Sequence, residues 1–339
     1  MKTKRPSLLA VLLKDFFENH LSKLRGMSQN TIHSYRDGMV LLLRFIASHR
    51  NRPASSLDLS DLGPKEILSF LIHLEQGRNN RASTRNNRLS AVHSFFRFVA
   101  AQHPDHLEQV QRILGIPFKK TNSRVIDYLE YYEIQEILSV IDRSTSKGRR
   151  DYALLSTMFN TGARVQEILN LKACDLQLNK PFQVRLMGKG RKQRVCPIWP
   201  QTAQLLRRLC MEIQIDLNSE VSVFRNCQGA PLTRFGVRYI LNNCLKRAQD
   251  SIPNLRSKRI HPHSMRHSTA VALIKSGVDL STISQWLGHP SLDTTNRYAA
   301  IDLEMKRKAI ESVKPVQDQR SITVPWHRDK TIIEWLESL

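Results

Sequence analysis

The sequence predicts a mainly α-helical protein of two domains with one small antiparallel β-sheet. Three observations support this fold class. Segments in both halves of the 339-residue chain place apolar residues at helical spacing, and an apolar content of 41% is enough for two packed cores. In residues 182–198, apolar and polar side chains instead alternate on both sides of a Gly-Lys-Gly turn, which is typical of a β-hairpin. Between the halves, residues 115–124 (GIPFKKTNSR) show no periodicity, which predicts a domain junction.

The N-terminal domain, expected over residues 1–118, should be a small helical bundle. Residues 28–48 open with Ser28 as a candidate N-cap and place apolar side chains at helical spacing. The next segment predicts a helix that begins near Pro64 and ends at Gly77. Proline at a helix start and glycine at its end are the usual boundary residues.

A third helix should begin at Ser83, with leucine, valine and phenylalanine on its core face. Polar side chains form a stripe on another face. The chain carries 52 Lys and Arg against 30 Asp and Glu, a net charge of +22 shared by both halves, so nucleic acid is the leading candidate partner. We therefore expect this stripe to contact DNA through Arg85, Asn86, Ser90, His93 and Arg97.

The second domain, expected over residues 119–315, should begin with a helical pattern. A further helix runs through residues 150–171 and is interrupted at Gly162. The hairpin and more helices follow, and Gly277 and Gly288 each follow an apolar helical run, which predicts helix C-caps.

The bulk composition excludes several classes of protein. Five cysteines are scattered without a C-x-x-C pair, which favours reduced thiols over disulfides or zinc. No run of 18 apolar residues could span a membrane, and the N-terminal stretch meets an acidic residue before its apolar part reaches signal-peptide length. We expect a cytoplasmic protein.

A set of cationic and polar residues in the second domain suits reaction at a phosphodiester. Planar arginine forks bind the phosphoryl oxygens that gain charge in the transition state, and a tyrosine nucleophile needs a base and an acid beside it. The candidate catalytic residues are Arg164, Lys189, His263, Arg266, His289 and Tyr298.

A zinc site is the alternative for the histidine-rich segment. His261, His263 and His267 lie close in sequence, but only the last two are at i, i+4 spacing and no glutamate follows as in H-E-x-x-H. We therefore expect no metal. His267 is expected to be structural or to support the neighbouring arginine.

Four segments in order resemble the tyrosine recombinases, or phage-integrase-type recombinases, and among them the Xer-like branch. These segments are TGARVQEIL, GKGRKQRVCPI, HPHSMRHSTA and WLGHPSLDTTNRY, and the N-terminal helices resemble the family's helical SAM-like core-binding domain. The resemblance covers nearly the whole chain. It implies the fold of a core-binding domain followed by a tyrosine recombinase catalytic domain.

The resemblance also implies a role for each candidate. Tyr298 would attack a phosphodiester to form a 3′-phosphotyrosine, while Arg164 and Arg266 clamp the phosphate. Lys189, with Lys192 as the alternative, would protonate the leaving 5′ oxygen, and no cofactor would be consumed. His263 would handle the tyrosine proton and His289 would hydrogen-bond a phosphoryl oxygen.

Other residues remain open between two interpretations. Glu167 either orients the active-site cations or forms an i, i+3 ion pair on a helix surface. Thr233 predicts a helix N-cap followed by Arg234 and Arg238 one turn apart, which are DNA contacts or a solvated charged face. Near the hairpin, the expected phosphate contacts are Arg191, Lys192 and Arg194.

The last segment, residues 316–339, places Ile332, Trp335, Leu336 and Leu339 at helical spacing. With little chain left to bury this apolar face, it is expected to dock on a neighbouring protomer, as such helices often do in this family; docking within the same chain is the alternative.

The expected activity is site-specific recombination of double-stranded DNA by a tetramer on two sites, through a Holliday junction. A mobile-element integrase or transposase is favoured, with or without a second recombinase or accessory DNA-bending proteins. The alternatives are an Xer-type chromosome or plasmid dimer resolvase, a DNA-relaxing enzyme resembling type IB topoisomerases, and a DNA-binding factor with an inactive catalytic domain.

Overall fold

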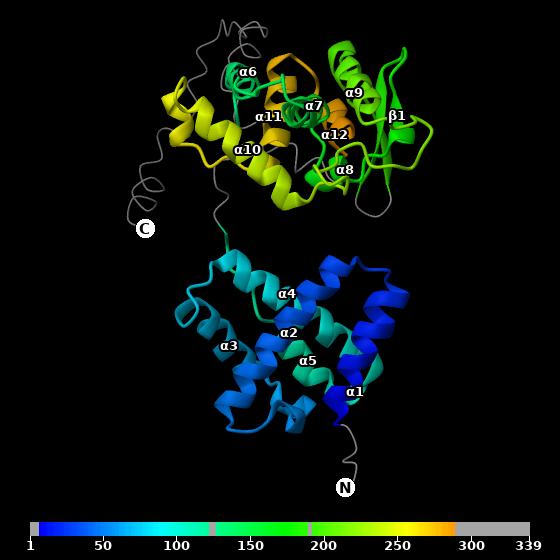
Figure 1. Ribbon diagram of the computed structural model, residues 1–339. Coiled ribbons are helices and arrows are strands. Elements are labelled where there is room, and N and C mark those ends of the chain that lie inside the picture. Colours follow the sequence, from blue (N-terminus) through cyan, green and yellow to red (C-terminus); the bar gives the residue numbers. More distant parts are fainter. Residues whose placement is uncertain (1–6, 122–126, 189–191, 289–339) are drawn as a thin grey trace, which may run out of the picture. The chain divides into compact units, whose positions relative to one another are not determined.

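A computed structural model describes residues 7–121, 127–188 and 192–288, and the chain divides into two compact units between Val125 and Ile126 (Figure 1). Each unit has its own hydrophobic core. The fold is mainly helical with one three-stranded antiparallel sheet, as the sequence predicts.

The N-terminal unit is a bundle of helices. Its long helices begin and end where the sequence predicts: the Ser28 side chain accepts a hydrogen bond from the Thr31 amide, and α3 starts at Pro64 and stops before Gly77. The first and last elements of the unit are additional to the helices that the sequence predicts. The elements are α1 (Leu8–Asp15), a π-helical segment (Phe16–Leu24), α2 (Gln29–His49), α3 (Pro64–Gln76), α4 (Ala82–Gln102) and α5 (Leu107–Leu114).

Helix α4 lies at the centre of this bundle and packs against α2, α3 and α5. Its second half is buried on nearly every side, with Phe95 and Phe96 fully enclosed. The Phe16 ring from the π-helical segment meets Phe95 edge-on, with centroids 5.4 Å apart, a favoured arrangement of aromatic rings. Because α4 is enclosed in this way, fewer of its polar side chains face solvent than its sequence pattern suggests.

The C-terminal unit is built around α7. Its elements are α6 (Tyr131–Ser139), α7 (Ser146–Thr161), α8 (Val165–Leu169), β1 (Leu176–Gln177), β2 (Gln183–Met187), β3 (Gln193–Pro197), α9 (Pro200–Glu212), α10 (Arg234–Ala248), α11 (Pro262–Lys275) and α12 (Leu280–Leu287).

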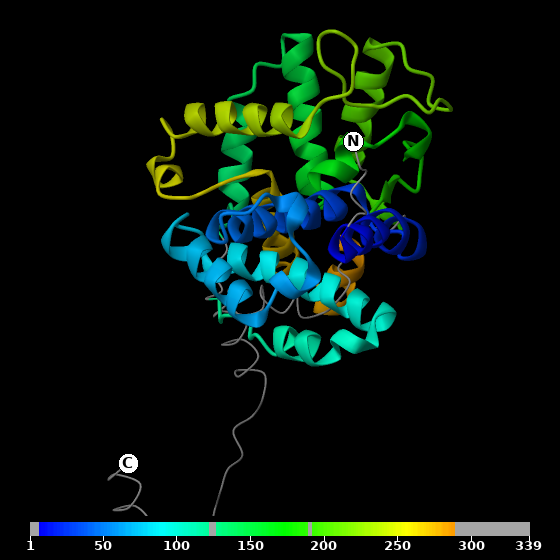
Figure 2. The same ribbon diagram turned by 90° about the horizontal axis from the view of Figure 1, so that it is seen from below.

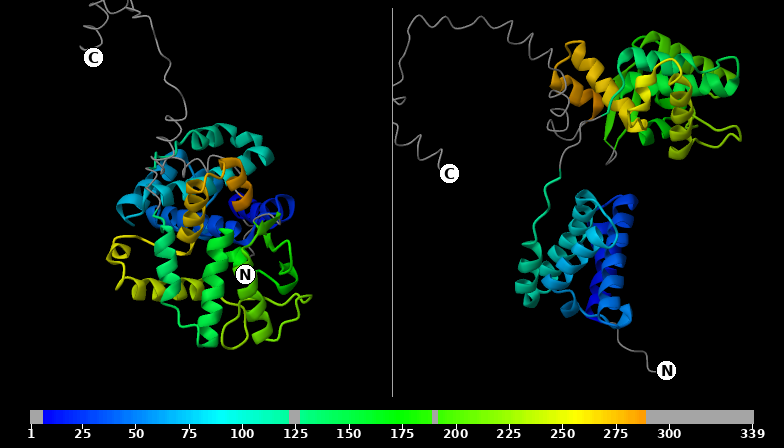
Figure 3. Two further views of the ribbon diagram at one scale, coloured as in Figure 1. Left: turned by 90° about the horizontal axis from the view of Figure 1, so that it is seen from above. Right: turned by 90° about the vertical axis from the view of Figure 1, so that its left-hand side faces the viewer.

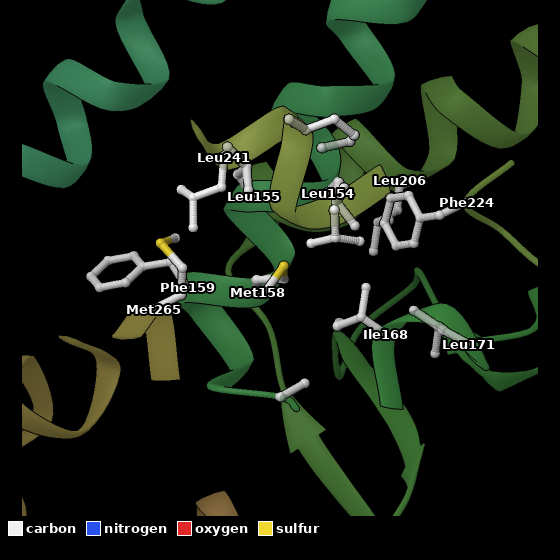
Figure 4. Close-up of a cluster of buried hydrophobic side chains, with 14 of the residues drawn as sticks. Leu154, Leu155, Met158, Phe159, Ile168, Leu171, Leu206, Phe224, Leu241 and Met265 are labelled. Carbon is white, nitrogen blue, oxygen red and sulfur yellow. The ribbon is translucent and has the colours of Figure 1, made fainter. Parts of the chain in front are cut away.

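Residues of α7 fill the centre of the core. Met158 and Leu154 lie among apolar side chains contributed by the elements around them, including Ile168 and Leu241 (Figure 4). Helix α7 packs against α6, α8, α9 and α11. This central position is why its second half is buried on every side, including polar residues such as Thr157 and Asn160.

The sheet and the remaining helices pack on one another. The sheet has the order β1-β2-β3, and the predicted hairpin pairs Gln183 with Pro197 and Met187 with Gln193. Helices α11 and α12 pack side by side, and α10 crosses α6 (Figures 2 and 3). The C-terminal ends of α7 and α12 both lie within hydrogen-bonding reach of the first half of α11.

Candidate active site

The chain leaves α7 at Gly162, which adopts the left-handed conformation (φ +57°) and ends the helix. A Cβ here would lie 2.4 Å from Leu287 Cδ2 and 3.2 Å from Thr269 Cγ2. Glycine is therefore required by the backbone conformation and by the close approach of α11 and α12. The turn leaves Arg164 as the N-cap of the short helix α8.

Arg266 connects three elements from its place on α11. Its Nη1 donates to the Gly162 carbonyl at 2.7 Å, and its Nη2 donates to the Leu287 carbonyl at 2.6 Å. Only 1% of the residue is exposed. Because the last carbonyls of a helix lack partners within that helix, this arginine completes the hydrogen bonding at the ends of α7 and α12.

Arg164 lies beside the same turn and remains one third exposed. Its Nη1 donates to Glu167 Oε1 at 2.7 Å, and its Nη2 reaches the Gly288 carbonyl at 3.2 Å. Gly288 is the predicted left-handed C-cap of α12 (φ +63°), and Gly277 after α11 is also left-handed (φ +82°). The structure thus brings Arg164 and Arg266 to adjacent carbonyls at the end of one helix.

Glu167 receives hydrogen bonds from two arginines. Its side chain is 3% exposed, and Oε2 accepts from the Arg164 amide at 2.9 Å and from Arg194 Nη2 at 2.7 Å. Burial alone would raise its pKa, but the hydrogen bonds and charge of Arg194, with those of Arg164, lower the pKa below its usual range. Glu167 therefore forms the expected i, i+3 ion pair with Arg164, but as a buried carboxylate that also binds Arg194.

Arg194 corrects one sequence prediction. It was expected to contact DNA phosphates, but its side chain is only 11% exposed, and its Nε donates to the Trp286 carbonyl at 2.9 Å. Its guanidinium is engaged within the protein. Strand alternation was the available signal, since the period that buries Cys196 puts Arg194 on the same inward face of β3.

His263 lies in the first turn of α11, one turn before Arg266. Its ring meets the His267 ring edge-on, with centroids 4.5 Å apart. Loss of solvation, and then the charges of Arg266, His261 and Arg164, lower the pKa of His263 to about 4. The imidazole is therefore neutral at pH 7 in the DNA-free protein, the form that has a nitrogen lone pair, and a nearby phosphate would strengthen it as a base by opposing the arginine charges.

His261 caps α11, because its Nδ1 accepts a hydrogen bond from the Ser264 amide at 3.2 Å. The ring is thus used in helix capping. Among the residues that the structure describes, no group of three His, Cys, Asp or Glu side chains could hold a metal ion.

Helix α10 presents two arginines next to His263. Thr233 is its N-cap, as predicted, with its hydroxyl accepting from the Gly236 amide at 3.1 Å. Arg234 and Arg238 line a cavity of about 730 Å³ whose wall also includes His263. Phe235, which the sequence analysis missed, lines this cavity and is 84% exposed; an aromatic residue between two arginines was the available signal.

The remaining sequence-predicted residues of this site divide into two groups. Lys192 is described and exposed, and its carbonyl accepts from the Gly188 amide at 2.8 Å, which closes the base of the hairpin loop. Outside the described residues lie Lys189, Arg191, His289, Tyr298 and the tail 316–339.

The residues of α4 that were predicted to face DNA do not form one exposed surface, so this prediction is wrong for the buried members. Arg85 is 5% exposed and donates from Nη1 to the Pro117 carbonyl at 2.9 Å. His93 is 3% exposed, with its Nε2 3.0 Å from the Ile113 carbonyl. Asn86 donates from Nδ2 to the Lys119 carbonyl at 2.8 Å. These side chains hold the segment after α5 against α4.

The two other residues of that stripe are more accessible. Ser90 is partly exposed and Arg97 is exposed. Arg97 is therefore the member of the stripe best placed to meet an external phosphate.

Family models match both parts of the chain. Residues 127–305 match the phage integrase family, and residues 14–103 match the N-terminal SAM-like domain of phage integrases. A protein of Sinorhizobium fredii named as an integrase/recombinase, y4rC, is 37% identical over 99% of this chain and 100% of its own length. The tyrosine recombinase XerC of Bacillus pumilus is 33% identical over 91% of this chain and 98% of its own length.

Solved structures share the fold. The XerH site-specific recombinase bound to difH substrate has a TM-score of 0.65 at 22% identity, covering 87% of this chain and 83% of that one. The Tn1549 transposon integrase with circular intermediate DNA has a TM-score of 0.63 at 16% identity, covering 91% and 100%.

None of the described helices is both long and apolar enough to cross a membrane.

The matches to both domains, together with the relative that aligns over its full length, establish the family. The chain belongs to the phage integrase family, the tyrosine recombinases, which are enzymes that cleave and rejoin DNA.

Proposed function

We propose that this protein is a site-specific DNA recombinase that uses Tyr298 as its nucleophile and acts through a 3′-phosphotyrosine intermediate. The observation that carries the proposal is the convergence of Arg164, Arg266 and His263 where α7, α11 and α12 meet. Two cations and a neutral base at one place suit the charge and proton demands of phosphoryl transfer.

The reaction can be written in terms of these residues. The Tyr298 hydroxyl oxygen forms a bond to phosphorus, and the bond from phosphorus to the 5′ oxygen breaks. Neutral His263 takes the tyrosine proton, and Lys189 gives a proton to the leaving 5′ oxygen. Arg164 stabilises the added negative charge on the non-bridging oxygens, together with the positive charge of Arg266, whose Nη atoms bind the Gly162 and Leu287 carbonyls in the DNA-free protein. His289 donates a hydrogen bond to one of these oxygens.

The phosphotyrosine retains the energy of the broken diester. A 5′ hydroxyl from another strand can therefore attack it and release Tyr298 without a nucleotide or cofactor. Exchange of one strand pair and then the other, within a tetramer on two duplex sites, gives recombination through a Holliday junction.

The biological role that we favour is integration, excision or transposition of a mobile element in the cytoplasm. The relative named as an integrase/recombinase supports this role, because it aligns with 99% of this chain. Chromosome or plasmid dimer resolution is the second candidate, favoured by the relatives named XerC. A second recombinase or an accessory DNA-bending protein is compatible with either role.

The chemistry is tested with duplex DNA from the regions that flank the gene, nicked close to each candidate cleavage point so that the short 5′-hydroxyl strand diffuses away. The expected result is a covalent protein–DNA adduct that resists denaturation and is lost in Tyr298→Phe. Lys23→Met, which changes an exposed lysine on the π-helical segment, is the control. If Tyr298→Phe retained the adduct, the nucleophile assignment would be wrong.

The role is tested by sequencing DNA junctions in cells that express the protein beside its native flanking DNA. Junctions between element ends and new target sites support the mobile-element role. Junctions only between two copies of one site support dimer resolution, and relaxation of supercoiled DNA lacking any site would indicate topoisomerase-like activity.

Trans docking of the tail, residues 316–339, is part of the proposal. Removal of residues 323–339 should abolish cooperative assembly on a DNA with two sites. Unchanged cooperativity would favour docking within one chain.

A further inference from the structure

Arg194 makes contacts that connect the hairpin with Glu167, the partner of Arg164, and with the last turn of α12. It is the second residue of β3, three positions after Arg191, and its Nη2 donates to Glu167 Oε2 at 2.7 Å. Its Nε binds the Trp286 carbonyl at 2.9 Å, in the last turn of α12. One side chain therefore ties a strand to two helices.

The packing around Arg194 adds to these hydrogen bonds. A Cβ built on Gly288 would lie 3.1 Å from Arg194 Cδ, so the α12 cap closes directly over this side chain. A Cβ on Gly188 would lie 3.4 Å from Glu167 Oε1, which places the residue before Lys189 beside the same carboxylate. Three segments that carry candidate catalytic residues thus meet around Arg194 and Glu167.

The charges give Arg194 a second effect. Arg164 and Glu167 alone form a neutral pair, in which the carboxylate competes with a phosphate for the Arg164 guanidinium. With Arg194 included, the buried group carries a net charge of +1. Since Arg194 is 11% exposed and Arg164 is 33% exposed, the accessible part of that charge lies on Arg164.

We propose that Arg194 is a positioning residue for strand cleavage, acting through Glu167 on Arg164 and through Trp286 on the turn that precedes His289. It does not touch the DNA. This inference rests on the proposed function, because the step that it supports is the attack of Tyr298.

The test compares Arg194→Met with Arg185→Met. Arg185 is on β2 of the same hairpin, is about half exposed and pairs with Asp175 at 2.9 Å, so its loss also removes an ion-paired arginine but leaves Glu167 untouched. Adduct formation on the nicked duplex should fall about 100-fold in Arg194→Met, the size expected when catalytic groups are misplaced by about 1 Å. DNA affinity should change less than about threefold, and Arg185→Met should keep the wild-type rate.

A double-mutant cycle separates positioning from general loss of structure. In the Glu167→Gln variant no carboxylate competes with a phosphate for Arg164. Adding Arg194→Met to this variant should therefore lower the rate of adduct formation by much less than 100-fold. Arg194→Lys should give an intermediate rate, because one ammonium cannot reach both Glu167 and the Trp286 carbonyl. The proposal would be overturned if Arg194→Met lowered the rate of adduct formation equally in the wild-type and Glu167→Gln proteins. It would also be overturned if the rate fell only in proportion to the unfolding temperature.

A measurement without DNA distinguishes failure of this inference from failure of the proposed function. The guanidinium protons of Arg164, assigned by comparison with Arg164→Lys, should exchange faster with water in Arg194→Met but not in Arg185→Met. Faster exchange supports the positioning role even if no adduct forms on the chosen DNA, in which case the proposed function fails alone. Unchanged exchange would contradict the positioning role.

Discussion

Arg266 Nη1 donates a hydrogen bond to the carbonyl oxygen of Gly162, 104 residues earlier in the chain, at 2.7 Å. The same guanidinium binds the Leu287 carbonyl at 2.6 Å. One side chain on α11 therefore binds the ends of both α7 and α12, and five predictions follow from this arrangement and its surroundings.

Arg266→Lys should lower the free energy of unfolding of the C-terminal unit by about 2 kcal/mol. A single ammonium cannot satisfy both carbonyls, and an unpaired buried acceptor costs about 1–3 kcal/mol. Urea unfolding followed by tryptophan fluorescence measures this unit, since all four tryptophans follow residue 126. Arg238→Lys, an exposed change on α10, should leave the unfolding midpoint in place.

Gly162→Ala should be more destabilising than Gly229→Ala. Both glycines have positive φ, so each alanine costs about 1–2 kcal/mol of backbone strain. Only Gly162 is also crowded, by Leu287 and Thr269, whereas no atom lies within 4 Å of a Cβ built on Gly229. Adding Leu287→Ala should relieve part of the Gly162→Ala cost, and strict additivity in urea unfolding would argue against this crowding.

His263 should stay neutral in the DNA-free protein until the pH falls to about 4. Because its pKa in an unfolded chain is about 6.5, the unfolded state binds more protons between these two values, and the unit should lose stability as the pH falls from about 6.5 to 4. His263→Gln should flatten this dependence. Imidazole proton shifts measured by NMR give the titration directly, and a midpoint near 6.5 would contradict it.

The stability that the ion pairs of Glu167 contribute should be lost at a lower pH than the stability associated with neutral His263. Its pKa is depressed in the folded protein, so its contribution is present above about pH 4.5 and is lost as the pH falls through the folded-state pKa. The two groups can therefore be separated in one stability profile, with His263→Gln changing only the upper part.

Arg234→Ala and Arg238→Ala should each weaken DNA binding and reduce the slope of log affinity against log salt by about 1 if the side chain meets a phosphate. We expect Arg234→Ala, at the start of α10, also to reduce the preference for the native site over unrelated DNA, because we assign it to base contact. Binding curves at several salt concentrations measure both effects. Arg85→Ala, which removes a buried side chain, should instead lower the stability of the N-terminal unit.

Much of the fold followed from the sequence, because helix limits are local. Ser28, Pro64 and Thr233 act at the helix starts where the sequence places them, and Gly162 and Gly288 end their helices. Caps and turns depend on residues three or four positions apart, so a pattern within one segment contains the information. The hairpin at 183–197 is predictable for the same reason.

Side-chain partners that are distant in sequence were less predictable. The sequence treats Arg85, His93 and Arg194 as polar side chains free to meet DNA, yet each binds a backbone carbonyl of another segment. Nothing in the neighbouring residues of α4 indicates that residues 113–119 return to cover it. Composition predicts the positive charge but cannot say which cations become buried.

The sequence by itself determined the helical class, the hairpin, the family and the order of the residues proposed to carry the chemistry. Only the tertiary structure decided that Arg266 binds the ends of two helices, that Glu167 holds two arginines, and that Arg194 faces inward. The physical reason is that periodicity records which face of an element is apolar, whereas the partner of a buried polar group is set by where separate elements pack.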